Sequence, residues 1–239
     1  RRGCVHADSL TGFKWLATCA ARLCGERGLS HLLAYEEAIG YQLSPLVPDK
    51  DGISACAVFC ELAVHWAAHG SSVRGRYEAI EREIGFFATH NGYFICREPS
   101  VMREIFDSFR KAGASCELRL EAGEDVPAKA YGATSYPQSV GDLRLQSVRD
   151  VTLGLDTAAS DLSSPLPATP KDQMLTLRFE DGSIATLRGS GTEPKLKYYV
   201  EASDLTGRAA AQQRAEMVAK VVIDNVLQPK RYGLQTPSV

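Results

Sequence analysis

Apolar residues recur at helical spacing early in the chain, within residues 53–69. Those that fall on one side of such a helix are Ala55, Val58, Phe59, Leu62 and Trp66. A stripe of this width is typical of a helix that buries one face against a core. Asp51 is suited to cap the first turn and Gly70 to end the last. The pattern therefore predicts a capped helix with one buried face.

The segments around this helix indicate an α/β unit. A short apolar strand is expected at residues 30–35, before the helix, and two short segments follow it at residues 77–84 and 93–96. Because strand and helix alternate here, an α/β fold is favoured. We expect this first domain to cover residues 1–95.

A second part of the chain opens with another amphipathic helix, expected at residues 100–111. Its apolar stripe consists of Val101, Ile105, Phe106 and Phe109. Residues 121–142 contain glycines and prolines but few large apolar side chains, and residues 160–171 contain prolines among small polar residues. We expect both segments to be loops.

Apolar and polar residues alternate after these loops. The alternation of residues 175–179 leads to Asp181-Gly182 and resumes beyond it, which is the pattern of a β-hairpin. A third strand is expected at residues 196–201 and an alanine-rich helix at residues 206–227. Residues 96–239 are therefore predicted to form an α+β domain, with an antiparallel sheet flanked by helices.

Composition and charge narrow the class of protein. The chain has 239 residues, and 27 Lys and Arg against 29 Asp and Glu give a net charge of -2. This balance offers no basic field for nucleic acid or for a membrane surface, and the longest apolar stretch is too short to span a bilayer. Seven scattered cysteines without a C-x-x-C pair are typical of free thiols. We expect a cytoplasmic protein and, since the first residue is not methionine, one cut from a longer chain.

The densest group of anion-binding residues is the run RGSGTEPKLK at residues 188–197, between two expected strands. Its glycines let the backbone of residues 189–192 approach an anion with N–H groups turned inward, and Ser190 and Thr192 add hydroxyl donors. Arg188 offers a planar fork that matches phosphate oxygens, and the two lysines add point charges. A glycine-rich turn with incidental charges is the alternative, but the density of donors favours an oxyanion site.

Two earlier loops carry candidate ligand-binding residues of another kind. Glu36 lies in the run YEEAIGY at residues 35–41, at the end of an expected strand, where open α/β sheets bind ligands. A carboxylate there can accept hydrogen bonds from two sugar hydroxyls, although solvated surface glutamates are the alternative. Lys50, in the run DKDG at residues 49–52, precedes a helix and would reinforce anion binding. By itself this run is also an ordinary N-cap turn.

Other chemical motifs are weak or missing. Glu61, His65 and His69 have the spacing of zinc ligands on a helix, but no glutamate lies between the histidines and no further ligand is evident. We therefore expect a half-solvated helix face there, not a metal site. The sequence has no P-loop and neither G-x-G-x-x-G nor G-x-S-x-G. No nucleophile has a base within sequence reach, so no catalytic residue is expected in this chain.

Four motifs occur here in the order found in the α-D-phosphohexomutases: TGFKW at residues 11–15, YEEAIGY, DKDG and RGSGTEP. The chain most resembles the phosphopentomutase and glucose-1,6-bisphosphate synthase branch, through GYFIC at residues 92–96 and the tail at residues 228–235. The resemblance covers nearly the whole chain apart from the two expected loops.

The resemblance implies an enzyme of four domains, of which this chain matches the third and fourth. The third would be a parallel-rich α/β layer that reads sugar hydroxyls, and the fourth a sheet flanked by helices that clamps a phosphate. The phosphoserine of the first domain and the Mg²⁺-binding D-x-D-x-D loop of the second have no counterpart here. Glucose-1,6-bisphosphate would be the activator and intermediate. Expected partners are thus sugar phosphates and the missing N-terminal domains.

The resemblance also implies a role for individual residues. Thr11 and Gly12 would line the sugar site, Glu36 would accept hydrogen bonds from sugar hydroxyls, and Lys50 would reach the ligand. The phosphate clamp would consist of Arg188, Ser190, Gly191, Thr192 and Lys197. Ala38 stands where phosphoglucomutases proper carry serine, so a pentose phosphate fits more easily. A non-catalytic phosphosugar-binding module and a glucose-1,6-bisphosphate synthase are the alternatives.

Overall fold

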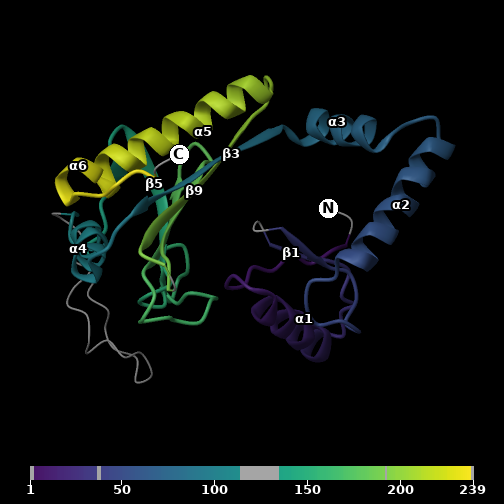
Figure 1. The fold of residues 1–239 in the computed structure, drawn as a ribbon, viewed down its shortest axis with the longest axis horizontal. Helices are drawn as coiled ribbons and strands as arrows, with labels where there is room; N and C mark the ends of the chain where they lie inside the picture. The colour runs from purple at the N-terminus through teal and green to yellow at the C-terminus, as the bar shows by residue number, and fades with distance from the viewer. Residues whose placement is uncertain (1–2, 37–38, 114–134, 192, 238–239) are drawn as a thin grey trace. The chain divides into compact units, whose positions relative to one another are not determined.

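The computed structural model describes residues 3–36, 39–113, 135–191 and 193–237. The chain divides into two compact units, unit 1 at Arg1–Ile80 and unit 2 at Glu81–Val239 (Figure 1). This boundary lies earlier than the expected one between residues 95 and 96. The reason is that β3 (Phe86–Ile95), which includes most of the segment expected at residues 93–96 to close the first domain, pairs along its whole length with β9 (Lys195–Asp204) of unit 2.

Unit 1 consists of helices and one small hairpin. Helix α1 (Phe13–Arg27) is followed by β1 (Ala34–Glu36), β2 (Gly40–Gln42) and α2 (Gly52–Ala68). The two strands pair antiparallel, so the described residues of unit 1 contain no parallel strand pair of the kind that the family resemblance implies. Helix α1 was not among the predicted elements, although Phe13, Leu16, Ala20 and Leu23 recur at helical spacing along it; of its residues only Phe13 is buried.

Helix α2 begins where the sequence predicts but does not bury the expected face. Asp51 accepts hydrogen bonds from the backbone N–H groups of Ile53 at 3.0 Å and Ser54 at 3.1 Å, which confirms the N-cap. However, none of the 17 helical residues is buried, and Phe59 is 55% exposed. The prediction of a buried face is wrong for this chain. Among the described residues, the apolar core of unit 1 is too small to receive the helix: Leu10, Phe13 and Ala34.

Unit 2 is built on a sheet whose strands all pair antiparallel, in the order β3-β9-β8-β7-β5-β4, with β6 paired to β5. The remaining strands are β4 (Ser139–Val140), β5 (Leu143–Asp150), β6 (Leu155–Asp156), β7 (Met174–Phe179) and β8 (Ile184–Gly189). The hairpin predicted at Asp181-Gly182 joins β7 to β8 and is confirmed. Gly182 has a φ of 84°, a left-handed conformation that glycine adopts without strain.

Helices flank this sheet, as the sequence predicts. Helix α5 (Arg208–Val222) continues into a π-helical turn (Ile223–Leu227) and runs across β3 and β9 (Figure 1). Side chains along β7, β8 and β9 are buried in alternation. They share one core with the inner face of α5, which contributes Ala215, Val218, Ala219 and Val222. The opposite side of these strands carries half-exposed side chains.

Two shorter helices complete unit 2. Helix α4 (Pro99–Arg110) confirms the helix expected at residues 100–111 and adds Ile105, Phe106 and Phe109 to the core. Helix α6 (Pro229–Tyr232) follows the π-helical turn. In the ranges that the structure describes, no helix has the length and apolar character needed to cross a membrane.

Candidate functional site

The open side of the unit 2 sheet carries three cationic side chains near one turn. Arg188, near the end of β8, lies directly opposite Lys197 of β9. Residues that face each other in an antiparallel pair project to the same side of the sheet. Lys195 precedes Lys197 by two residues on the same strand and therefore projects to that side as well. All three are half-buried, whereas their neighbours Leu187 and Leu196 are fully buried on the other side.

Backbone carbonyl groups already accept hydrogen bonds from two amides at the start of the loop between β8 and β9. The N–H of Ser190 donates to the carbonyl of Lys195 at 2.9 Å, and the N–H of Gly189 donates to the carbonyl of Gln173 at 2.9 Å. The expectation that both amides turn toward an anion is therefore wrong, because protein carbonyls already engage them. Gly191 is exposed, and its N–H has no partner among the described residues. Thr192 lies outside the described residues.

Lys195 is engaged within the protein, whereas Arg188 and Lys197 are available. The Lys195 Nζ lies 2.9 Å from Glu193 Oε1 and 4.6 Å from the centroid of the Tyr93 ring. This hydrogen bond lowers the pKa of Glu193 and raises the pKa of Lys195. In the described part of the chain, neither Arg188 nor Lys197 has a carboxylate within ion-pair distance. The turn thus presents two cations on one side of the sheet that form no ion pair among the described residues, although the charge of Lys197 also helps to lower the pKa of Glu193.

A buried ion pair fixes the position of Gln173, the residue whose carbonyl accepts the Gly189 N–H. Arg110 of α4 and Asp150 of β5 are 4% and 0% exposed, and Arg110 Nε donates to Asp150 Oδ2 at 2.6 Å. Arg110 Nη1 also donates at 2.9 Å to the side chain of Gln173, whose main-chain carbonyl accepts the Gly189 N–H. Burial acts to lower the pKa of Arg110, but its bonds to Asp150 and Asp107 outweigh that effect and leave the pKa raised. Sequence reasoning missed this pair because its members are 40 residues apart and no local motif links them.

In unit 1, three of the residues predicted to contact a sugar lie around Phe13. The N–H of Gly12 donates to Glu36 Oε2 at 2.8 Å. Lys50 Nζ lies 5.6 Å from the centroid of the Phe13 ring. Gly40, opposite Glu36 in the hairpin, also contacts this ring, and a Cβ there would approach it to 2.5 Å. The sequence motif contained Phe13, but nothing in the pattern indicated that this ring organises the site.

The remaining residues predicted for unit 1 are placed only in part. Thr11 is exposed and precedes Gly12. Lys50 Nζ lies 3.3 Å from Asp49 Oδ1, and hydrogen bonds from the backbone and side chain of Lys50 lower the pKa of Asp49. Residues 37 and 38, which include the serine-to-alanine difference at Ala38, lie outside the described residues.

The described residues do not form a metal centre. No group of three or more His, Cys, Asp or Glu side chains among them is arranged to hold an ion. On α2, His69 Nδ1 lies 2.7 Å from the carbonyl of His65, and the two imidazole rings lie tilted against each other, so these histidines contact each other along the helix. The side chains described here therefore do not fit a magnesium site.

The segment that contains the β7–β8 hairpin, the following loop and the start of α5 also has a family signature. Residues 147–220 match the C-terminal domain of phosphoglucomutase/phosphomannomutase. This segment of unit 2 is therefore similar to the C-terminal domain of the phosphoglucomutase/phosphomannomutase family. Arg188 and Lys197 of this chain both lie within the matched range, on adjacent strands.

Similarity to phosphomutases extends over the rest of the chain. This chain is 34% identical to human phosphopentomutase over 98% of the chain, and 33% identical to human glucose 1,6-bisphosphate synthase over 100% of the chain. Both matches span 36% of the relative, so the chain covers about a third of the length of these proteins. Among solved structures, it shares the fold of parafusin, a phosphoglucomutase from Paramecium, with a TM-score of 0.59 and 16% identity. That match covers 96% of this chain and 35% of parafusin.

Proposed function

We propose that this chain is the substrate-binding C-terminal part of a phosphomutase. The whole enzyme would interconvert sugar 1-phosphates with hexose 6-phosphates or pentose 5-phosphates through a bisphosphate intermediate. The observation that carries the proposal is the Arg188–Lys197 pair, two cations without carboxylate partners in the described residues, on one side of the sheet and beside an exposed glycine. That the bound phosphate belongs to a sugar phosphate is inferred from the names of two relatives, a phosphopentomutase and a glucose 1,6-bisphosphate synthase.

Unit 2 would hold the phosphate that is not transferred. The guanidinium of Arg188 can donate two parallel hydrogen bonds to phosphate oxygens, and Lys197 adds a point charge. Because both side chains are half-buried, their attraction to an anion is less screened than that of fully exposed cations. The hydroxyl of Ser190 and the N–H of Gly191 supply neutral donors next to them, and Thr192 would add a second hydroxyl. Lys195, tied to Glu193, would shape the loop and bind phosphate less directly.

Unit 1 would read the hydroxyl groups of the sugar. Glu36 uses Oε2 to hold the Gly12 N–H, which leaves Oε1 as an acceptor for sugar hydroxyls. The bond to Gly12 fixes the orientation of this carboxylate before a ligand arrives. Lys50, beside the Phe13 ring, would contact the same ligand. Thr11 would line the loop next to Gly12.

The phosphoryl-transfer machinery would come from the remainder of a longer protein. Phosphoryl transfer needs a positioned nucleophile and stabilisation of charge, and the family resemblance places a phosphoserine and a magnesium loop in domains that this chain lacks. The residues described here would bind and orient the substrate, with glucose 1,6-bisphosphate as the doubly phosphorylated intermediate. Because one relative is a glucose 1,6-bisphosphate synthase at 33% identity, synthesis of that bisphosphate is the second candidate activity.

Nuclear magnetic resonance on the isotope-labelled chain tests the proposal. Ribose 5-phosphate and inorganic phosphate should both shift the signals of Arg188, Gly191 and Lys197, whereas ribose without a phosphate should leave them unchanged. The chain alone should show no mutase turnover. Unchanged signals on addition of ribose 5-phosphate would overturn the clamp, and measurable turnover would overturn the assignment of the nucleophile to other domains.

A further inference from the structure

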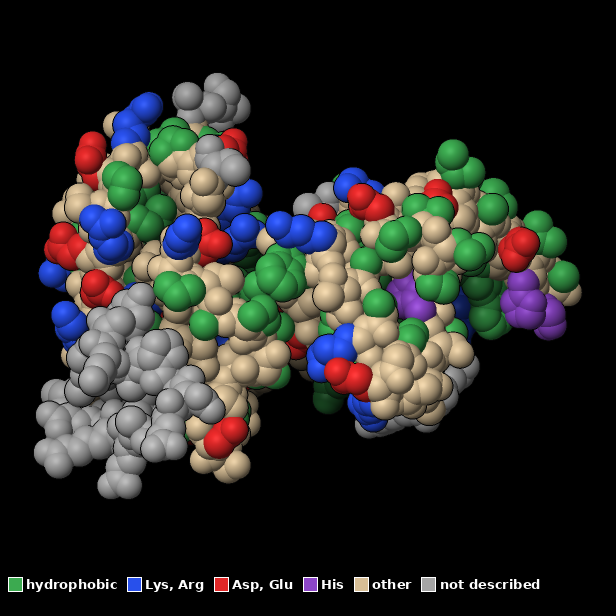
Figure 2. Space-filling view, turned by 90° about the horizontal axis from the view of Figure 1, so that it is seen from below, with side chains coloured by type: hydrophobic (Ala, Val, Ile, Leu, Met, Phe, Trp, Pro, Cys, Tyr) green, Lys and Arg blue, Asp and Glu red, His purple; other side chains and the backbone are tan. Residues whose placement is uncertain are grey.

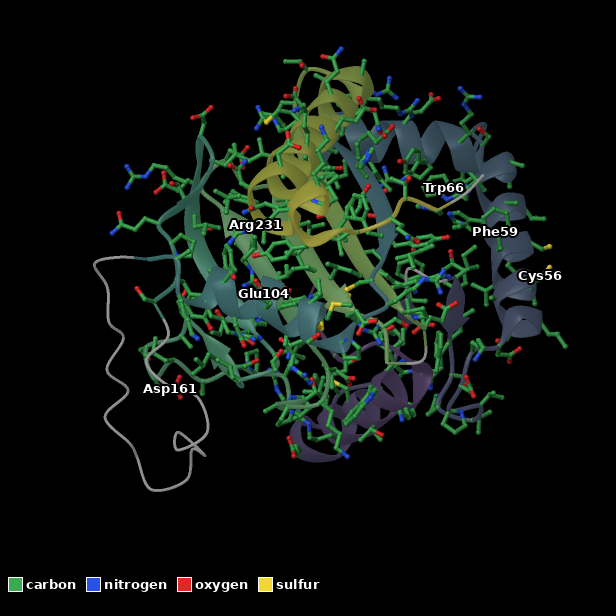
Figure 3. All side chains as sticks on the ribbon, turned by 60° about the vertical axis from the view of Figure 1, so that its left-hand side comes forward. Cys56, Phe59, Trp66, Glu104, Asp161 and Arg231 are labelled. Carbon is green, nitrogen blue, oxygen red and sulfur yellow. The ribbon has the colours of Figure 1, made fainter. Side chains whose placement is uncertain are left out.

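Helix α2 is apolar along its length, yet it is not covered. Among its 17 residues, Glu61 is the single Asp, Glu, Lys or Arg. Cys56, Phe59 and Trp66 follow one another along the helix (Figure 3). Its large exposed apolar side chains are Ile53, Val58, Phe59, Leu62 and Val64. Hydrophobic side chains cover much of the surface at the end of unit 1 that contains α2 (Figure 2).

This composition is typical of a helix that is packed against other parts of a protein. A surface helix normally carries a polar side, and a helix that is hydrophobic on most sides is normally buried. Monomeric proteins rarely expose apolar patches larger than a few hundred Å². Most of the stability of a helix in a protein also comes from packing its apolar side. The amino-acid sequence of α2 therefore matches a covered position, and the other described residues of unit 1 do not cover it.

The rest of unit 1 likewise has few buried apolar side chains and several exposed ones. The main hydrophobic cluster of the described chain begins at Phe94 and includes no residue of unit 1. Leu32, Leu33 and Tyr35, before and within β1, are 64%, 56% and 52% exposed. A unit of this length needs a substantial core to offset the conformational entropy that folding removes. Whatever covers α2 must therefore be large enough to extend the core of unit 1.

We propose that the exposed apolar side of α2, defined by Val58, Phe59 and Leu62, is an intramolecular interface. Its occupant is a segment of the same polypeptide that precedes these 239 residues. The chain covers 36% of human phosphopentomutase, and its matched domain is the C-terminal one of the family, so most of such a protein would lie on the N-terminal side. A preceding segment long enough to extend the core of unit 1 can cover Leu32 and Leu33 as well as α2. The proposal concerns stability and stands independently of the phosphate clamp.

The test compares the 239-residue chain with the full-length gene product. In the full-length protein, Phe59→Ser should lower the melting temperature by about 5–10 °C, because it removes a large side chain from a core. Val64→Ser is the matched control: Val64 lies five residues later and about 140° round the helix, outside the defined surface. It should change the melting temperature by about 2 °C or less. Phe59→Leu, which keeps an apolar side chain, should retain most of the stability if Phe59→Ser fails to fold.

In the 239-residue chain, the same substitution should not be destabilising, because the covering segment is absent. Phe59→Ser should reduce binding of a hydrophobic dye and leave the melting transition of unit 2 unchanged. Equal melting temperatures for Phe59→Ser and Val64→Ser in the full-length protein would overturn the proposal. So would strong hydrogen-exchange protection of α2 in the 239-residue chain, which would place the cover within this chain. A dimer of the 239-residue chain that Phe59→Ser dissociates, without destabilising the full-length protein, would identify a second copy instead.

Discussion

Arg188 and Lys195 project to the same side of one sheet, but their surroundings give them different roles. Lys195 has a carboxylate at 2.9 Å, which satisfies its charge within the protein. Arg188 has no such partner among the described residues, so its charge is available to a ligand. The difference arises from Glu193, which lies two residues before Lys195 and reaches it along the loop. Charge count alone would have ranked the two cations equally.

Arg188→Ala should therefore weaken binding of ribose 5-phosphate to the chain by roughly ten- to more than a hundred-fold, because a hydrogen bond to a charged group is worth about 1.5–3 kcal/mol. Arg188→Lys should recover only part of the affinity, since an ammonium keeps the charge but loses the planar fork. Titration calorimetry measures both effects.

Lys195→Ala is the matched control for Arg188→Ala. Its effect on affinity should be smaller, because the Lys195 ammonium is already paired, and circular dichroism should be unchanged in all three variants. A larger loss of affinity in Lys195→Ala than in Arg188→Ala would contradict the assignment of the available cation.

At the scale of a single element, the start of α2 depends on the ionisation of Asp51. Hydrogen bonds from Ser54 and from the backbone N–H of Ile53 lower the pKa of Asp51 below its ordinary value of 3.8. A carboxylate whose pKa is lower in the folded state stabilises that state above the unfolded pKa, and the contribution disappears as pH falls through the folded pKa. The cap should therefore be intact at neutral pH and be lost in acid below pH 3.8.

Hydrogen exchange at the Ile53 and Ser54 amides checks this dependence. After correction for intrinsic rates, their protection should be constant above about pH 5 and fall in more acidic solution. Asp51→Ala should remove that protection at every pH, because the acceptor is missing. Asp49→Asn serves as the control, since Asp49 binds Lys50 and not a helix amide. If Asp49→Asn reduced the protection as much as Asp51→Ala, the cap assignment would be wrong.

At the scale of the whole molecule, the two units differ in how they are held together. Unit 2 has a continuous core of strands and helices, together with the buried Arg110–Asp150 pair, whereas unit 1 buries three apolar side chains among its described residues. Asp150 also accepts hydrogen bonds from Tyr136 Oη at 3.0 Å and from the Leu153 N–H at 3.2 Å. This carboxylate thus joins α4, the end of β5 and the segment after it.

Asp150→Asn should lower the free energy of unfolding of unit 2 by up to about 3–5 kcal/mol, because it removes the buried carboxylate and leaves the buried Arg110 guanidinium with only the half-exposed Asp107 as an ion-pair partner among the described residues. Urea denaturation followed by circular dichroism measures the loss. The double variant Arg110→Met with Asp150→Leu should recover much of it, since apolar residues of similar size avoid the buried charge. A loss below about 1 kcal/mol in Asp150→Asn would show that the pair is not important for the stability of unit 2.

The sequence by itself determined the features that depend on neighbouring residues. The β7–β8 hairpin follows from strict alternation around Asp181-Gly182, and the N-cap of α2 follows from a carboxylate placed before an apolar helix. The candidate clamp could likewise be located from the sequence, because its donors lie within one short run at residues 188–197. Such features form through contacts between residues a few positions apart, so periodicity and turn chemistry are sufficient to predict them.

Tertiary structure decided everything that depends on distant partners. Strand β3 belongs to unit 2 because its hydrogen-bonding partner, β9, lies about a hundred residues further along the chain. The amides of Gly189 and Ser190 are taken by carbonyls, one of them at Gln173, whose position depends on the buried Arg110. The apolar pattern of α2 correctly gave a helix, but burial needs a second surface as well as an apolar stripe. Pattern fixes which side chains avoid water, whereas the rest of the fold decides whether anything is there to cover them.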